Sequence, residues 1–153
     1  MPAQQYRVVL DTNQIISAGS KWIDGTCEIG TDNISRRILI CVACSHNGLY
    51  SVDMFREYVR KLAEKHHDND CIVNDRIVKL MALIMGAFNI VQVATRTAPI
   101  RPRDLDDEVF LLCAIDGNAD YLVSDDGDLL VLAPDYPKPV IGKSQELAMV
   151  LGA

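Results

Sequence analysis

The amino-acid sequence predicts a single α/β domain with a central parallel sheet and helices on both faces. Three observations support this fold class. The chain has 153 residues, a length that suits one domain with a sizeable core. Short apolar segments of strand type alternate with longer segments of helical periodicity, which is the order that builds a parallel sheet. No repeat, low-complexity tract or linker divides the chain, so we expect one domain over residues 1–153.

The first half of the chain predicts two strands and three helices. We expect a strand over 6–10, a short helix from about residue 13 and a glycine-containing loop over 19–33. A helix over 34–46 follows, and Asn47-Gly48 is typical of a helix end. The segment LYSV predicts a short strand, and Ser51 can cap the next helix, which extends to about residue 66.

The second half continues the alternation. Residues 72–86 predict a helix, NIVQVAT a strand, and 105–116 a helix stopped by Gly117-Asn118. YLVS predicts a strand, KPVI a short strand, and Ser144 the start of the last helix, SQELAMVL. In such a sheet, ligands bind in the crevice outside the carboxyl ends of the strands.

The composition is that of an ordinary globular protein, with 49% hydrophobic and 24% charged residues. No apolar stretch approaches the roughly 18 residues of a membrane span, and the start MPAQQYR lacks a signal-peptide pattern. We therefore expect a soluble, cytoplasmic protein with no membrane partner. The five cysteines are expected to be reduced. Cys41 and Cys44 have C-x-x-C spacing inside an apolar helical run, which favours core positions over a metal or redox site.

Carboxylates gather at three points of the chain. Asp11 directly follows the first strand, a knot of four acids opens the helix at 105–116, and a knot of three follows YLVS. The two knots are Asp104, Asp106, Asp107 and Glu108, and Asp125, Asp126 and Asp128. A net charge of −6 by itself argues against a nucleic-acid partner. Clustered carboxylates are nevertheless typical of magnesium or manganese sites, because hard cations take oxygen ligands.

The strands YRVVL and YLVS deliver Asp11 and Asp125-Asp126 to one edge of the sheet. The helix at 105–116 feeds directly into YLVS, so we expect its N-terminus at the opposite end unless a turn of helix overhangs the crevice. Ordinary structural roles are also open for all three groups. Asp11 could cap the next helix, Asp104 and Asp107 resemble a capping box, and DDGD could be a plain turn.

Glu57 is the least distinctive acid. It lies roughly opposite the apolar stripe of its helix, which is formed by Phe55, Tyr58, Val59 and Leu62. Arg56, Arg60 and Lys61 surround it. The pattern alone therefore favours a solvated charged face at this position.

Four segments carry a resemblance to a known family: VVLDTNQIISA, EYVRKL from Glu57, DLDDEVFLLCA from Asp104, and ADYLVSDDGDLL from Ala119. Together they resemble a PIN domain, and more narrowly the VapC-like toxins of toxin–antitoxin modules, over nearly the whole chain. The resemblance implies Asp11, Glu57, Asp107 and Asp126 as catalytic metal ligands, with Asp128 as an accessory ligand. Asn13 and Ser124 would support them. The family usually has Thr-Gly-Asp after the last strand, where this chain has Ser124-Asp125-Asp126, so either aspartate is open as the ligand.

The resemblance also implies a metal-dependent ribonuclease that uses one or two magnesium or manganese ions and leaves a 5′ phosphate. Phosphate contacts would come from Arg96, Arg101 and Arg103, or from Arg56, Arg60 and Lys61, with a solvated surface as the alternative for both sets. Expected partners are RNA, an antitoxin with a basic side chain, and a second copy of the chain. A PIN fold that binds RNA or a protein without cutting is the first alternative. A phosphorelay receiver is the second, although the first strand yields only Asp11 instead of an acid pair.

Overall fold

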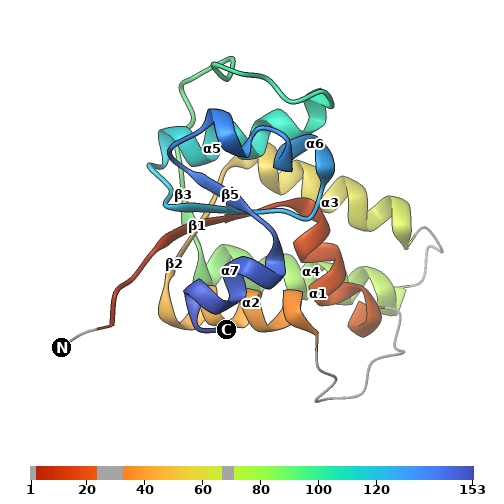
Figure 1. The fold of residues 1–153 in the computed structure, drawn as a ribbon. Helices are drawn as coiled ribbons and strands as arrows, with labels where there is room; N and C mark the ends of the chain where they lie inside the picture. The colour runs from red at the N-terminus through yellow and green to blue at the C-terminus, as the bar shows by residue number, and fades with distance from the viewer. Residues whose placement is uncertain (1–2, 24–32, 67–70) are drawn as a thin grey trace.

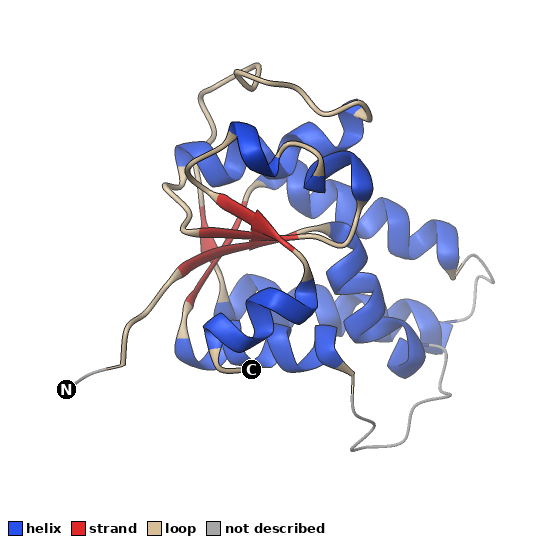
Figure 2. Cartoon of the chain, in the orientation of Figure 1, coloured by secondary structure: helices blue, strands red, loops and turns tan. Residues whose placement is uncertain are grey.

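The computed structural model of the protein describes residues 3–23, 33–66 and 71–153. Its centre is a five-stranded parallel sheet in the order β3-β2-β1-β4-β5 (Figures 1 and 2). The strands are β1 (Arg7–Leu10), β2 (Asn47–Tyr50), β3 (Asn89–Ile90), β4 (Tyr121–Val123) and β5 (Val140–Gly142). The predicted fold class is therefore confirmed.

Helices cover both faces of this sheet (Figure 1). The α-helices are α1 (Thr12–Ile23), α2 (Ile34–Ser45), α3 (Val52–Lys65), α4 (Cys71–Ala87), α5 (Glu108–Asp116), α6 (Gly127–Leu130) and α7 (Ser144–Leu151). Two 3-10 turns complete the list, η1 (Leu105–Asp107) and η2 (Ala133–Asp135). α5 lies on one face, and α2 and α7 pack together on the other beside α1 and α4. No helix in the described ranges combines the length and hydropathy that crossing a membrane requires.

β1 forms the centre of the core. Val8, Val9 and Leu10 are fully buried, because β1 is flanked by β2 and β4 and covered by helices on both faces. Tyr58 on α3 is also fully buried, and its hydroxyl donates a 2.5 Å hydrogen bond to the Leu10 carbonyl. This bond fixes α3 against the carboxyl end of β1, one residue before Asp11.

The predicted N-cap of α3 is confirmed, since the Ser51 hydroxyl accepts a hydrogen bond from the backbone N–H of Met54. α5 ends at Asp116 with Gly117 as its C-cap, and α7 begins at Ser144, as the sequence predicts. Cys41, Cys44, Cys71 and Cys113 are free thiols. The core positions expected for Cys41 and Cys44 are wrong, since Cys44 is exposed and Cys41 is only partly buried.

Several predicted boundaries are wrong. The loop expected over 19–33 is helical as far as Ile23, whose burial continues the apolar face of α1; residues 24–32 lie outside the described ranges. Asn47-Gly48 does not end α2 but opens β2. A Cβ at Gly48 would lie 2.5 Å from the ring of Phe88, so close packing explains this glycine.

The strand expected over NIVQVAT comprises only Asn89 and Ile90. The chain then leaves the sheet, because Asp116 accepts hydrogen bonds from the backbone N–H groups of Ala94 and Thr95 at 2.7 and 2.8 Å. The DDGD segment is not a plain turn, since α6 begins at Gly127.

Candidate metal centre

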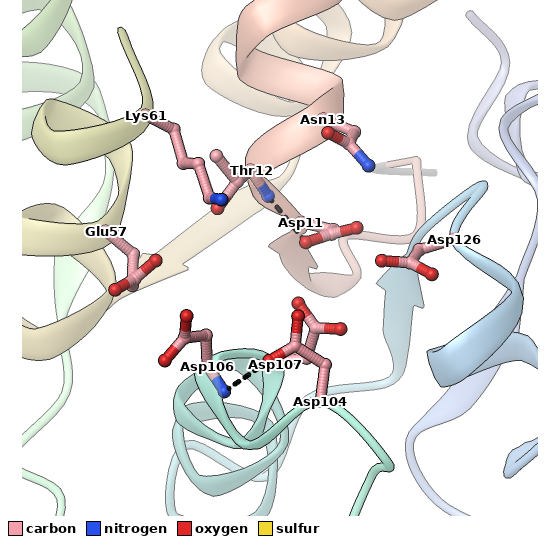
Figure 3. A pocket seen from close by; sticks show the side chains of 9 residues that line it. All are labelled: Asp11, Thr12, Asn13, Glu57, Lys61, Asp104, Asp106, Asp107 and Asp126. Atoms are coloured by element: carbon pink, nitrogen blue, oxygen red, sulfur yellow. Dashed lines mark hydrogen bonds between the residues drawn. The ribbon is translucent and has the colours of Figure 1, made fainter. Parts of the chain in front are cut away.

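An acidic cavity of about 140 Å³ opens at the carboxyl ends of β1 and β4 (Figure 3). The side chains that line it are Asp11, Thr12, Asn13, Glu57, Lys61, Asp104, Asp106, Asp107 and Asp126. They come from the end of β1, the start of α1, α3, η1 and the segment after β4. All four acids expected to be catalytic therefore lie around one cavity.

Asp11 is 1% exposed at the end of β1. Its Oδ1 accepts the backbone N–H of Thr12 at 2.7 Å, and its Oδ2 accepts the Ser124 hydroxyl at 2.8 Å. Burial raises the pKa of Asp11 to about 6; the two hydrogen bonds oppose this shift, and the charges of Asp126 and Asp125 add to it. Asp11 therefore accepts a hydrogen bond from the first N–H of α1 and also lines the cavity.

Asp107 lies at the end of η1, directly before α5, and its placement corrects a prediction. We expected the N-terminus of this helix at the opposite end of the sheet. A helix that leads into a parallel strand runs antiparallel to it, so α5 begins at the carboxyl edge, where the cavity lies. Asp107 is 9% exposed, and its Oδ2 is a buried oxygen with no hydrogen-bond partner.

The surroundings of Asp107 penalise its charge. Burial, followed by the negative charges of Asp11, Asp126 and Asp104, raises the pKa of Asp107 to about 7. A buried carboxylate oxygen without a donor costs free energy unless a cation or a proton is bound to it. The negative charge in the cavity is thus not compensated when the cavity contains only the protein's own groups.

The two adjacent aspartates after β4 have different surroundings. Asp126 lines the cavity, caps α6 by accepting the Asp128 N–H at 2.9 Å, and donates its own N–H to the Ser124 hydroxyl at 3.0 Å. Asp125 is not among the lining residues. Its carboxylate accepts hydrogen bonds from Gln14 at 2.9 Å and from the backbone and hydroxyl of Ser144 at 2.9 and 2.8 Å.

The residues present fit a divalent cation. Asp107, Asp126 and Asp128 each offer a carboxylate oxygen, and the three oxygens lie within 4.8 Å of one another. Oxygen donors of this kind suit magnesium or manganese. The unpartnered Oδ2 of Asp107 is a second, independent indication, because a bound cation would satisfy it.

Glu57 reaches the cavity from α3, although the sequence pattern favoured a solvated position. Its side chain is 18% exposed and makes a two-pronged ion pair with Arg60, at 3.1 Å to Nε and 2.9 Å to Nη2. Arg60 also contacts Glu64 at 2.8 Å and Asp106 at 3.1 Å. It therefore links α3 to η1 beside the cavity.

The three arginines expected to bind phosphate lie outside the cavity lining. Arg101 makes a two-pronged ion pair with Glu108, at 2.6 Å from Nε and 3.0 Å from Nη2. This pair lowers the pKa of Glu108. Arg96 and Arg103 are exposed on the segment between β3 and η1. Arg56, from the other set, is an exposed partner of Asp53.

The sequence reasoning did not single out Thr12 as part of the site. It named Lys61 only within the second of two alternative sets of phosphate contacts. It treated Asp104 and Asp106 as members of an acidic group, with a capping role as the alternative for Asp104. Asp104 lines the cavity and caps η1 by accepting the Asp106 N–H at 3.0 Å. The spacing of Lys61, four residues after Glu57 on one helix, is the signal that would have placed it on the same face.

Comparisons with known proteins support the fold and identify the family. The chain is similar in structure to a chain of the VapBC2 crystal structure from Rickettsia felis bound to a DNA fragment from its promoter. The TM-score is 0.54 at 12% sequence identity, over 90% of this chain and 98% of the other. No curated protein matches the sequence.

The PIN domain family model matches residues 7–128, which include every acid around the cavity. This family match excludes the phosphorelay receiver, the second alternative that the sequence left open. The chain belongs to the PIN domain family.

Proposed function

We propose that the protein is a cytoplasmic, metal-dependent ribonuclease and the toxin of a toxin–antitoxin pair. The observation that carries the proposal is the unpartnered, buried Oδ2 of Asp107 in a cavity lined by six carboxylates. A cavity of this kind binds divalent cations, and a nucleic-acid phosphate is a substrate that such cations recognise.

In this proposal Asp107, Asp126 and Asp128 hold the first magnesium or manganese ion, and Asp11 and Glu57 supply further oxygen ligands. Bound divalent ions lower the pKa of a coordinated water and stabilise charge on the phosphate. Ser124 orients Asp11 through its hydroxyl, as second-sphere donors orient metal-binding carboxylates. Asn13, exposed at the rim, has an amide that can donate to the substrate.

The test is cleavage of a mixture of single-stranded RNAs by the purified protein with manganese, with magnesium, and with a chelator. We expect cleavage only with metal, and products that carry a 5′ phosphate. Asp11→Asn and Asp126→Asn should reduce the rate by roughly 100-fold or more while the protein stays folded. Metal-independent cleavage, or full activity in both variants, would reject the proposal.

The toxin role rests on the structural similarity to the Rickettsia felis VapBC2 chain and on the acidic cavity. A chain of net charge −6 with an acidic cavity attracts basic peptides, and arginine matches carboxylate geometry best. We therefore propose a small antitoxin with a basic side chain and a homodimeric toxin. Expression of the chain alone should slow growth, and co-expression of the neighbouring gene should restore it. Normal growth with active enzyme would remove the toxin role only.

A PIN domain that binds RNA without cutting is the second candidate. The Glu57–Arg60 ion pair favours it, because both carboxylate oxygens of Glu57 are already engaged. Metal-dependent RNA binding with no cleavage under any metal would select this alternative.

A further inference from the structure

The acidic cavity is lined by a single cationic side chain, counting only the residues that the structure describes. This residue is Lys61, on α3 one turn after Glu57. In the view of Figure 3 its side chain extends from α3 toward Thr12, on the opposite side from Asp126. The ammonium group of Lys61 thus shares one cavity with six carboxylates that together would bind cations.

The placement of Lys61 follows from the packing of α3. Tyr58 is tethered to the Leu10 carbonyl, and Met54, Tyr58 and Leu62 are buried. Residues four apart lie on one face of a helix, so the rotation of α3 that sets Glu57 over the cavity sets Lys61 there as well. The side chain of Lys61 is 42% exposed, which leaves its ammonium group accessible to a ligand in the cavity.

Lys61 and its neighbour Arg60 use their donors differently. Arg60 directs Nε, Nη1 and Nη2 to acids of α3 and η1. The carboxylate paired with Lys61 is Glu64, at 3.9 Å on the same helix, with a 54% exposed side chain. A pair this long between exposed groups holds the ammonium weakly. The amino group of Lys61 is therefore available to an anion.

We propose that Lys61 contacts the phosphate that is cleaved. The inference rests on the proposed ribonuclease function and adds one substrate-binding residue to it. In hydrolysis of a phosphodiester, the oxygen of a water bonds to phosphorus and the bond from phosphorus to the 3′ oxygen breaks. The 3′ oxygen leaves as a hydroxyl with the proton that the water gives up, and negative charge on the phosphate oxygens increases during this step. Lys61 meets that charge from the α3 side of the cavity, whereas the carboxylates hold the metal. A lysine ammonium is a compact charge that suits a single phosphate oxygen.

The test compares Lys61→Ala and Lys61→Arg with Lys65→Ala. Lys65 is an exposed lysine at the end of the same helix and does not line the cavity, so it controls for loss of one positive charge. Three quantities are measured for each protein: the manganese concentration that gives half of the thermal stabilisation, the Kd for a single-stranded RNA in calcium, and kcat/KM with manganese.

Lys61→Ala should lower kcat/KM by roughly 100-fold and weaken RNA binding, while Lys61→Arg recovers most of both and Lys65→Ala changes little. Manganese should bind Lys61→Ala more tightly, by about 3-fold or more, because a repelling charge has been removed. A merely structural role for Lys61 would weaken manganese binding instead. That result, or kcat/KM and RNA affinity equal to those of Lys65→Ala, would overturn the inference.

The two proposals fail in different ways. If the wild type binds RNA but does not cleave it, the ribonuclease function is rejected, and Lys61 is judged by the loss of RNA affinity in Lys61→Ala. If the wild type neither binds nor cleaves RNA, both proposals are rejected. If the wild type cleaves RNA and Lys61→Ala cleaves it equally well, only the role of Lys61 is rejected.

Discussion

Ser124 holds Asp11 through a 2.8 Å hydrogen bond between residues that are 113 positions apart in the sequence. The same hydroxyl oxygen accepts the backbone N–H of Asp126 at 3.0 Å. One fully buried serine thus sets the relative position of two acids from the neighbouring strands β1 and β4.

Ser124→Ala should weaken both metal binding and folding. The change leaves a buried carboxylate oxygen and a backbone N–H without partners, which costs about 1–3 kcal/mol of unfolding free energy. Loss of a second-sphere donor typically lowers metal affinity by about 10- to 100-fold. Urea unfolding and a manganese titration measure the two effects. Ser17→Ala, at an exposed position of α1, is the control. Unchanged manganese affinity in Ser124→Ala would contradict the orienting role.

Asp107→Asn should make the metal-free protein more stable and remove its response to metal. The amide carries no charge, so it escapes the burial and the repulsion that raise the pKa of Asp107. We expect a melting temperature roughly 3 °C higher without metal, and little further increase with manganese. The wild type should instead melt at higher temperature as manganese is added. A lower melting temperature for metal-free Asp107→Asn would show that the charge of Asp107 does not destabilise the metal-free protein.

The stability of the metal-free protein should increase as the pH falls from about 8 to about 5. In the folded protein the pKa of Asp11 is about 6 and that of Asp107 is about 7, against an ordinary aspartate value of 3.8. A group whose pKa is raised on folding contributes stability that is complete below its unfolded pKa and lost as the pH rises through its folded pKa. Below about pH 4, Asp116, Asp125 and Glu108, whose pKa values are lowered, reverse the trend.

Urea unfolding in metal-free buffers across this pH range measures the slope. Saturating manganese should reverse it, because the ion competes with protons for the same oxygens. Asp107→Asn should have a shallower slope than the wild type. A metal-free wild type that loses stability steadily from pH 8 to pH 5 would contradict the raised pKa values.

Asp125→Asn and Asp126→Asn should separate folding from activity. Asp125 binds Gln14 and the start of α7, so its change should cost about 1 kcal/mol of stability and leave most of the cleavage rate. Asp126 lines the cavity, so its change should abolish cleavage with a smaller effect on stability. Unfolding free energy and cleavage rate are measured on the same preparations. The reverse pattern would assign the metal to Asp125.

Arg101→Ala should affect mainly the stability of the fold, and Arg103→Ala should affect mainly RNA binding. Arg101 makes an ion pair with Glu108, which is buried, so removing Arg101 leaves this carboxylate with only the backbone N–H of Ala98 as a partner and should destabilise the fold. Arg103 is exposed, and its loss should instead weaken RNA binding and lower the dependence of Kd on salt. Equal effects of both changes on the salt dependence would restore Arg101 as a phosphate contact.

The architecture could be predicted because it depends on local patterns. The run VVL, buried on both faces of the sheet, and the strand–helix alternation specify the layers without knowledge of any contact. Ser51 could be assigned as a cap because capping involves only the next few residues. The length of β3 could not, since the exit of the chain after Ile90 depends on Asp116, which lies 21 and 22 positions away from the N–H groups that it binds.

The site could be predicted only in part, because its members meet through tertiary contacts. The sequence predicts that Asp11 and Asp126 share an edge, but the choice between Asp126 and Asp125 depends on which one Ser144 and Gln14 engage. The position of Glu57 could not be predicted from the sequence. The hydrogen bond from Tyr58 to the Leu10 carbonyl turns α3 toward the cavity, and the helical periodicity does not reveal this bond.

The sheet order β3-β2-β1-β4-β5 also determines when the site can exist during synthesis of the chain. β1 is made first but lies at the centre, and it lacks one neighbour until β4 has been translated. A growing chain that already contains Asp11, Glu57 and Asp107 still lacks Ser124 and Asp126. Domains fold as units once the strands that complete them are available. Under the proposed ribonuclease function, the metal site is therefore incomplete until the segment that follows β4 has been made.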